Sequence, residues 1–154
     1  MKKLLIVCAA FLLIAQLAAC IETSVSLGLS FEKSIIAKKV DGKWQPVENQ
    51  KFKKGDKIGL VLLNVSGFKK DKNGLNWMDL DVEVKDSNGK IILTQTGLLG
   101  ESGRMDFKNN VAESPVGSFV TNNTIASGKY NIKVTVHDKI GGGKTENSRS
   151  FQLE

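Results

Sequence analysis

Short runs in which apolar and polar residues alternate are the feature that most constrains this chain. The cleanest run is Tyr130-Asn131-Ile132-Lys133-Val134-Thr135-Val136, and similar runs recur almost to the C-terminus. A period of two residues is that of a β-strand with one buried face, whereas an amphipathic helix repeats every 3.6 residues. Because no long helical pattern interrupts these runs, we expect an all-β fold.

Turn signals divide the alternating runs into strands. Asp41-Gly42 is expected to close a hairpin between Ile35–Val40 and Lys43–Val47, and Asn88-Gly89 one between Trp77–Val84 and Lys90–Thr96. Further strands are expected at Val25–Leu29, Lys57–Val65, Val116–Thr121 and, after the turn Gly141–Gly143, over the segment that ends at Phe151 and Leu153. The polar segment from Gly97 to Pro115 is expected to be a loop with an irregular strand or one helical turn.

The parity of side chains predicts which faces are buried. Val25, Leu27 and Leu29 alternate with small polar residues and are expected to share one buried face. The segment Lys57–Val65 is apolar on both sides, which predicts a central strand between two covered faces. Of the two tryptophans we expect Trp77 inside and Trp44, on the first hairpin, partly exposed.

Seven to eight short strands without interposed helices indicate an antiparallel sandwich, with a closed barrel as the alternative. The stretch from Ser127 to Asp138, with Tyr130 at the start of its strand, resembles the penultimate strand of immunoglobulin-like and fibronectin type III-like domains. That resemblance implies an immunoglobulin-like β-sandwich. The cysteine pair of antibody-type domains is absent.

The first twenty residues have the pattern of an export signal. Lys2 and Lys3 are followed by an uncharged, mostly apolar run from Leu4 to Ala19, which is shorter than the roughly 20 residues that a membrane-spanning helix needs. The run ends in Leu17-Ala18-Ala19-Cys20, which resembles the bacterial lipobox.

The lipobox resemblance implies cleavage between Ala19 and Cys20 and a covalent lipid on the Cys20 thiol. We therefore expect a signal peptide over residues 1–19, a lipidated tether over 20–24 and a β-sandwich domain over 25–154. The alternative is a secreted protein with Cys20 as a free thiol. Cys8 lies in the removed segment, so the mature chain has no disulfide. Ile21, rather than Asp, after the cysteine implies the outer membrane if the source is Gram-negative.

Charge argues against nucleic acid as a partner. Without Lys2 and Lys3, the chain carries 20 basic against 16 acidic side chains, and the basic ones are dispersed without interleaved aromatic residues. A solvated surface explains this mild excess, and attraction to anionic headgroups is the alternative.

Few residues combine into a catalytic or metal-binding pattern. Asp71, Asp79 and Asp138 are weak candidates for a calcium site, although a row such as Asp79, Asp81 and Glu83 on one strand face is usually a solvated surface. His137 is the single histidine and is expected on the outer face of its strand. The run Gly141-Gly142-Gly143-Lys144-Thr145 lacks the first glycine of a phosphate-binding loop and is expected to be a turn.

Two functions follow as hypotheses. The first is a non-enzymatic, membrane-anchored binding or assembly module for a protein partner in the envelope, with no cofactor beyond the lipid on Cys20. The second is a carbohydrate-binding module for cell-wall or surface glycan, in which Trp44 and Trp77 offer flat apolar faces to sugar rings.

Overall fold

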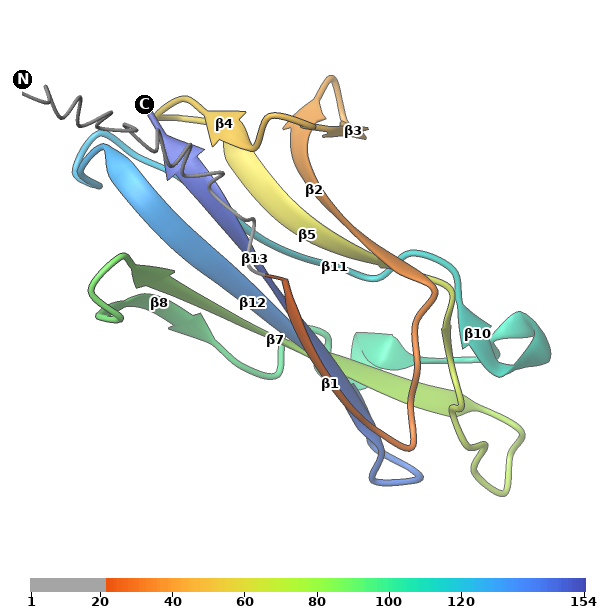
Figure 1. Cartoon of the computed structure of the whole chain (residues 1–154). Helices are drawn as coiled ribbons and strands as arrows, with labels where there is room; N and C mark the ends of the chain where they lie inside the picture. Colours follow the sequence, from red (N-terminus) through yellow and green to blue (C-terminus); the bar gives the residue numbers. More distant parts are fainter. Residues whose placement is uncertain (1–21) are drawn as a thin grey trace, which may run out of the picture.

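The computed structural model describes residues 22–154, which form an antiparallel sandwich of two β-sheets (Figure 1). The larger sheet contains, in spatial order, β1 (Thr23–Leu27), β13 (Lys144–Leu153), β12 (Gly128–Asp138), β7 (Asn76–Asp86) and β8 (Ile91–Gln95). The smaller sheet contains, in spatial order, β11 (Val116–Val120), β5 (Lys57–Leu63), β2 (Lys33–Val40) and β3 (Lys43–Pro46). Two separate sheets confirm the predicted sandwich and exclude the closed barrel.

Two-residue strands and two short 3-10 helices complete the described part of the chain. They are β4 (Lys51–Phe52), which runs parallel to β13, β9 (Arg104–Met105) beside β7, β6 (Val65–Ser66) paired with β10 (Val111–Ala112), η1 (Gly100–Gly103) and η2 (Lys108–Asn110). The long loop from Gly97 to Pro115 therefore holds both a helical turn and irregular strands. The pairing of β4 with β13 was not predicted.

Both predicted hairpins are present. β2 and β3 pair antiparallel across Asp41 and Gly42, whose φ angles are 49° and 80°. Two consecutive positive φ values match the twist of the flanking strands, and Asp-Gly adopts them with little strain. β7 and β8 pair across the turn that contains Gly89, as the sequence predicts.

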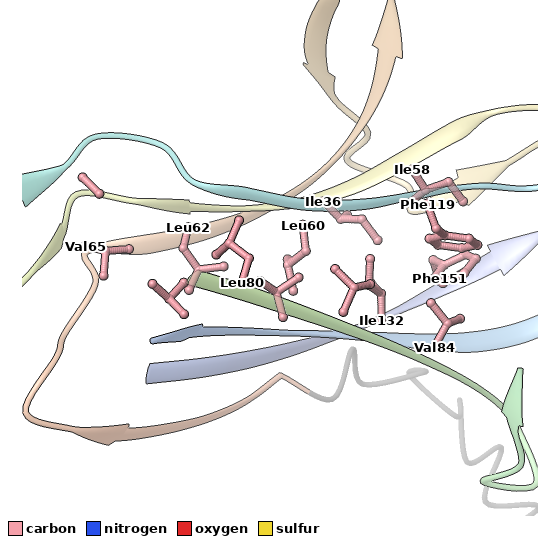
Figure 2. Packing of buried hydrophobic residues seen from close by; sticks show 14 of the residues in the cluster. Ile36, Ile58, Leu60, Leu62, Val65, Leu80, Val84, Phe119, Ile132 and Phe151 are labelled. Atoms are coloured by element: carbon pink, nitrogen blue, oxygen red, sulfur yellow. The ribbon is translucent and has the colours of Figure 1, made fainter. Parts of the chain in front are cut away.

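The core lies between the two sheets (Figure 2). The inner side chains of the smaller sheet include Ile36, Ile58, Leu60 and Leu62, and those of the larger sheet include Leu80, Val84, Ile132 and Phe151. Figure 2 shows these two rows of side chains pointing toward each other from opposite ribbons. Burial of such side chains contributes about 1.5–3 kcal/mol each, so this layer is the main source of stability.

A tyrosine at the start of β12 supports the immunoglobulin-like character of the sandwich. The Tyr130 hydroxyl donates a 2.6 Å hydrogen bond to the Ala126 carbonyl, four residues upstream, and the ring stacks on Phe151 at 5.6 Å. A tyrosine that bonds back to the preceding corner is a hallmark of such sandwiches. The predicted immunoglobulin-like β-sandwich is confirmed.

β1 differs most from its prediction. Leu29 is buried, but Val25 and Leu27 are 54% and 63% exposed on the outer face of the larger sheet. The prediction that these three residues share one buried face is wrong. The side of the chain that points between the sheets carries Glu22, Ser24 and Ser26 instead. Residues 22–24, expected in the tether, belong to the sandwich, since β1 begins at Thr23.

Candidate functional site

A groove lies between β8 of the larger sheet and β11 of the smaller sheet. Its volume is about 600 Å³. The apolar part of its lining is Ile92, Leu93, Phe119, Val120 and Ile125, and the polar part is Lys57, Gln95, Ser118, Asn122 and Thr124. Ile92 and Val120 are 38% and 58% exposed, so the apolar surface of the groove is open to solvent. Exposed apolar surface with a polar rim is typical of binding sites.

Two strand edges border this groove. β8 and β11 stand at the ends of their sheets, and within residues 22–154 each pairs with one strand only. Neither contains a charged residue or a proline, whereas β3, another edge strand, contains Lys43 and Pro46. Charges and prolines protect edge strands from pairing with another chain. The edges at this groove lack that protection.

Trp44 forms a second apolar surface, on the outer face of the smaller sheet. It is half-buried, as predicted, and its ring lies over Gly59 of β5, where a Cβ would come within 2.7 Å of two ring carbons and 2.8 Å of a Val116 methyl group. Ala37 faces the same side and is covered. Lys39 lies over the ring, with its Nζ 5.8 Å from the ring centre. The absence of a side chain at Gly59 therefore leaves the space that the six-membered ring of Trp44 occupies against the sheet.

The predicted central position of Lys57–Val65 is explained by this arrangement. β5 lies between β11 and β2, and its inner residues Ile58, Leu60 and Leu62 are buried in the core. On the outer side Gly59 and Val61 are also buried, although no further layer of described residues covers the sheet there. Trp44 and its neighbours supply that cover instead.

Trp77 is on the opposite side of the molecule, which contradicts the prediction that it lies inside. It is half-buried on the outer face of the larger sheet, where its Nε1–H donates a 2.8 Å bond to the Gly100 carbonyl. The Arg104 guanidinium lies 4.3 Å from the ring centre. Trp44 and Trp77 therefore lie on different outer faces and do not form one platform.

The acidic row of β7 holds the loop that covers Trp77. Asp79 is buried, and its Oδ1 accepts bonds from the amides of Leu80, Leu99 and Gly100. Burial raises the pKa of Asp79, but these amide bonds outweigh burial and hold that pKa below its ordinary value. Asp81 accepts the Gly97 amide and lies 2.7 Å from His137 Nε2. The expectation of a merely solvated row is wrong for Asp79.

Glu83 completes that row with two lysine contacts. Its Oε1 lies 3.0 Å from Lys85 Nζ and 3.2 Å from Lys133 Nζ. Burial opposes ionisation of Glu83, yet the bonds from the two lysines outweigh it and lower the pKa of the carboxyl. His137 lies on the outer face, as its parity predicted.

The other two weak metal candidates are also engaged with backbone amides. Asp71 accepts bonds from the amides of Asn73 and Leu75, and the Leu75 bond is the main reason that its pKa is lowered. Asp138, which is buried, accepts the amides of Lys69 and Ile140. Residues 22–154 contain no group of three or more His, Cys, Asp or Glu side chains placed to hold a metal ion.

A polar cluster at the β1 edge was not predicted from the sequence. Its buried members are Ser34, Thr145 and Asn147, and they are bonded to the partly exposed side chains of Glu22, Ser26 and Arg149. The sequence of β13 contains a signal for this cluster. Thr145, Asn147 and Arg149 alternate in step with the buried Phe151 and Leu153, so they lie on the same, inward side of the strand. Polar residues at buried parity predict specific hydrogen-bonded partners.

The predicted signal peptide, the lipobox Leu17-Ala18-Ala19-Cys20 and the proposed lipid site lie outside the described residues. Within the described residues, no helix is long and apolar enough to cross a membrane.

Comparison with known proteins establishes the fold alone. No protein-family description and no curated protein matches the chain. Among solved structures the chain is similar to the C-terminal domain of Wzt, with a TM-score of 0.54 and 13% identity over 86% of this chain and 78% of that one. It also overlaps, with a TM-score of 0.49 and 9% identity, a Niemann-Pick type C2 protein from the Japanese carpenter ant, over 84% of this chain and 96% of that one.

A third solved structure, the soluble domain of PmoD from Methylocystis sp., overlaps with a TM-score of 0.38 and 9% identity, over 82% of this chain and 96% of that one. At these identities a shared fold does not transfer a function. The chain is thus a β-sandwich domain.

Proposed function

We propose that this chain is a lipoprotein of the bacterial envelope, anchored through a lipid on Cys20, whose sandwich is a non-enzymatic module that binds a protein partner. The anchor is supported by the signal pattern and by Leu17-Ala18-Ala19-Cys20. In a Gram-negative source, Ile21 favours the outer membrane. The observation that carries the binding function is the open apolar groove between β8 and β11, bordered by two unprotected strand edges.

The groove suits an extended segment of the partner. A segment that pairs with the free edge of β11 gains main-chain hydrogen bonds, and its alternate side chains reach the apolar lining. β11 is the better template, because its pairing with β5 is regular, whereas a register shift interrupts the pairing of β8 with β7. Covering Ile92 and Val120 removes apolar surface from water. Because both side chains are already partly buried, each contributes only part of the roughly 1.5–3 kcal/mol that complete burial gives.

The non-enzymatic proposal is supported by the structural use of the buried carboxylates. Asp79 and Asp138 both hold loop amides. The mature chain offers no thiol once a lipid occupies Cys20, so nucleophilic catalysis by cysteine lacks its reactive group. We propose no cofactor other than the covalent lipid and no nucleic-acid partner.

The test is site-specific photo-cross-linking in cells of the source bacterium. A photoreactive residue at Val120, in the groove, is expected to capture one defined envelope protein, and Ile92→Lys in the same chain is expected to abolish that adduct by placing a charge in the groove. Gln45, exposed on β3, is the control position. Adducts of equal yield from position 45, or an adduct at position 120 that survives Ile92→Lys, would contradict the proposal.

Glycan binding on Trp44 is the second candidate, because the half-buried indole packs against Gly59 on an outer face, where Lys39 and Ser118 supply hydrogen-bonding groups. In a Trp77→Phe background, Trp44 becomes the sole tryptophan of the mature chain. Titration with cell-wall and surface glycan fragments would then change its fluorescence, and Trp44→Ala would lose binding. Fragment binding that persists in Trp44→Ala would exclude this site.

A further inference from the structure

β1 turns its apolar side chains to the outer face of the larger sheet, whereas polar side chains on its other side bond to the rest of the sandwich. Val25 and Leu27 are 54% and 63% exposed on the outer face of the larger sheet. The opposite side of the strand is held by specific bonds: the Ser26 and Thr145 hydroxyls lie 2.7 Å apart, and Glu22 Oε1 accepts a 2.7 Å bond from Ser34. Turning the strand over would break these bonds. Val25 and Leu27 are therefore fixed on the outer face, where the contact of their apolar side chains with water is unfavourable.

The strand also lies close to the proposed lipid. Thr23 pairs with Ser148, near the middle of β13, and Leu27 pairs with Lys144 at the beginning of that strand. Figure 1 shows β1 running along the flank of the larger sheet. Cys20 precedes Thr23 by three residues, which span at most about 10 Å even when fully extended. A lipid on Cys20 thus attaches beside the sheet edge and keeps β1 near the bilayer surface.

We infer that the corner of the sandwich formed by β1 rests on the bilayer and that Val25 and Leu27 enter its interfacial region. This inference rests on the proposed lipid at Cys20. Beside the apolar pair, Glu146 is the cross-strand neighbour of Val25 and Lys144 that of Leu27, so their charges offset one another. Contact with the lipid is therefore apolar rather than electrostatic.

This orientation also determines where the β8–β11 groove lies relative to the bilayer. β1 and β8 are the two opposite ends of the larger sheet, and β11 is the end of the smaller sheet that lies beside β8 across the groove. When the β1 corner rests on the membrane, the β8–β11 groove lies at the far edge of the sandwich. A partner in the aqueous part of the envelope then reaches the groove without meeting the bilayer.

The test uses a fluorescent label on the lipidated protein. When the full chain is expressed in a lipoprotein-processing bacterium, Cys8 is removed and Cys20 is blocked by lipid, so Leu27→Cys supplies the one reactive thiol. The label is an environment-sensitive nitrobenzoxadiazole, and the protein is reconstituted in phosphatidylcholine vesicles with and without spin-labelled lipid. Thr94→Cys is the matched control, because Thr94 is exposed on β8 at the opposite edge of the same sheet.

The label at position 27 is expected to emit at shorter wavelength than the label at position 94 and to be quenched by spin-labelled lipid. Equal emission and equally weak quenching at both positions would overturn the inference while leaving the anchor intact. Intact mass is measured before labelling: a chain without lipid on Cys20 would contradict the anchor, and the inference with it. The two failures are thereby distinguished.

Discussion

The guanidinium of Arg149 lies 2.8 Å from the carboxylate of Glu22, and the same guanidinium donates bonds to the hydroxyl and carbonyl oxygens of Ser34 at 2.9 and 3.1 Å. Glu22 precedes β1, Arg149 lies on β13 and Ser34 on β2. One side chain therefore joins the first described residue to both sheets. Because β1 buries no apolar side chain, this polar contact stabilises its docking.

Replacing Arg149 should loosen β1 before it unfolds the domain. Arg149→Ala leaves Glu22 and the Ser34 carbonyl without this donor. Because Glu22 is partly exposed and water screens the pair, we expect the loss to cost about 1 kcal/mol. In the variant, amide hydrogen exchange in β1 should be faster than in the parent protein, while exchange in β12 should stay unchanged. Lys129→Ala, at an exposed position on β12, is the control. Unchanged protection of β1 in Arg149→Ala would show that other contacts hold the strand.

Gly117 marks a close approach of the two sheets. A Cβ at this position would clash with methyl groups of Val134 and Val82 on the opposite sheet. Gly117→Ala is therefore expected to destabilise the fold by about 1–3 kcal/mol, as overpacking does. Denaturant unfolding measures this change, with Ser118→Ala as the neighbouring control. A variant as stable as the parent would mean that the sheets separate there at little cost.

Gly59 leaves the space in which the Trp44 ring packs against the sheet. Gly59→Ala places a methyl group where the indole ring lies, so the ring must lift from the sheet. In a Trp77→Phe background, we expect the fluorescence of Trp44 to shift to longer wavelength and its quenching by acrylamide to increase. The same spectrum before and after the substitution would contradict the packing of the ring against Gly59.

Asp79 should make the loop over Trp77 sensitive to acid. Its pKa is lowered in the folded state, so its ionised form contributes stability that is fully present above the unfolded pKa of about 3.9 and is lost as the pH falls through the lower folded pKa. The Trp77 indole bonds to Gly100 in that loop, and its fluorescence in a Trp44→Phe background reports the release.

Asp79→Asn is expected to loosen this loop already at neutral pH and to remove most of the acid transition in Trp77 fluorescence. Asp86→Asn, which removes a carboxylate that accepts the Asn88 and Lys90 amides in the β7–β8 turn, is the control. An acid transition of full size in Asp79→Asn would assign the pH dependence to another group.

The alternation of residues, together with the Asp-Gly and Asn-Gly turns, was sufficient to predict the longer strands, their hairpins and the central position of β5. It did not predict the orientation of β1, because alternation shows which side chains share a face but not which face is buried. That choice depends on partners distant in sequence: Ser26 meets Thr145, and Glu22 meets Arg149. A search for polar residues at the buried parity of β13 would have found this cluster.

The tryptophans were harder to place for a similar reason. Trp44 is partly exposed, as predicted. Trp77 lies on the same outward side of β7 as Asp79, but the prediction gave more weight to its large apolar ring than to its position in the alternation. The groove between β8 and β11 could not be predicted, since it depends on how the edges of two sheets meet. Its residues come from three separate segments of the chain.

The lipid anchor on Cys20 is tested most directly by the intact mass and detergent fractionation of the chain expressed in a lipoprotein-processing bacterium. We expect a mature chain that begins at Cys20, carries the added mass of a lipid and stays with the membrane, whereas Cys20→Ser lacks the lipid and leaves the membrane fraction. An unmodified, freely released chain would contradict the anchor and indicate simple secretion.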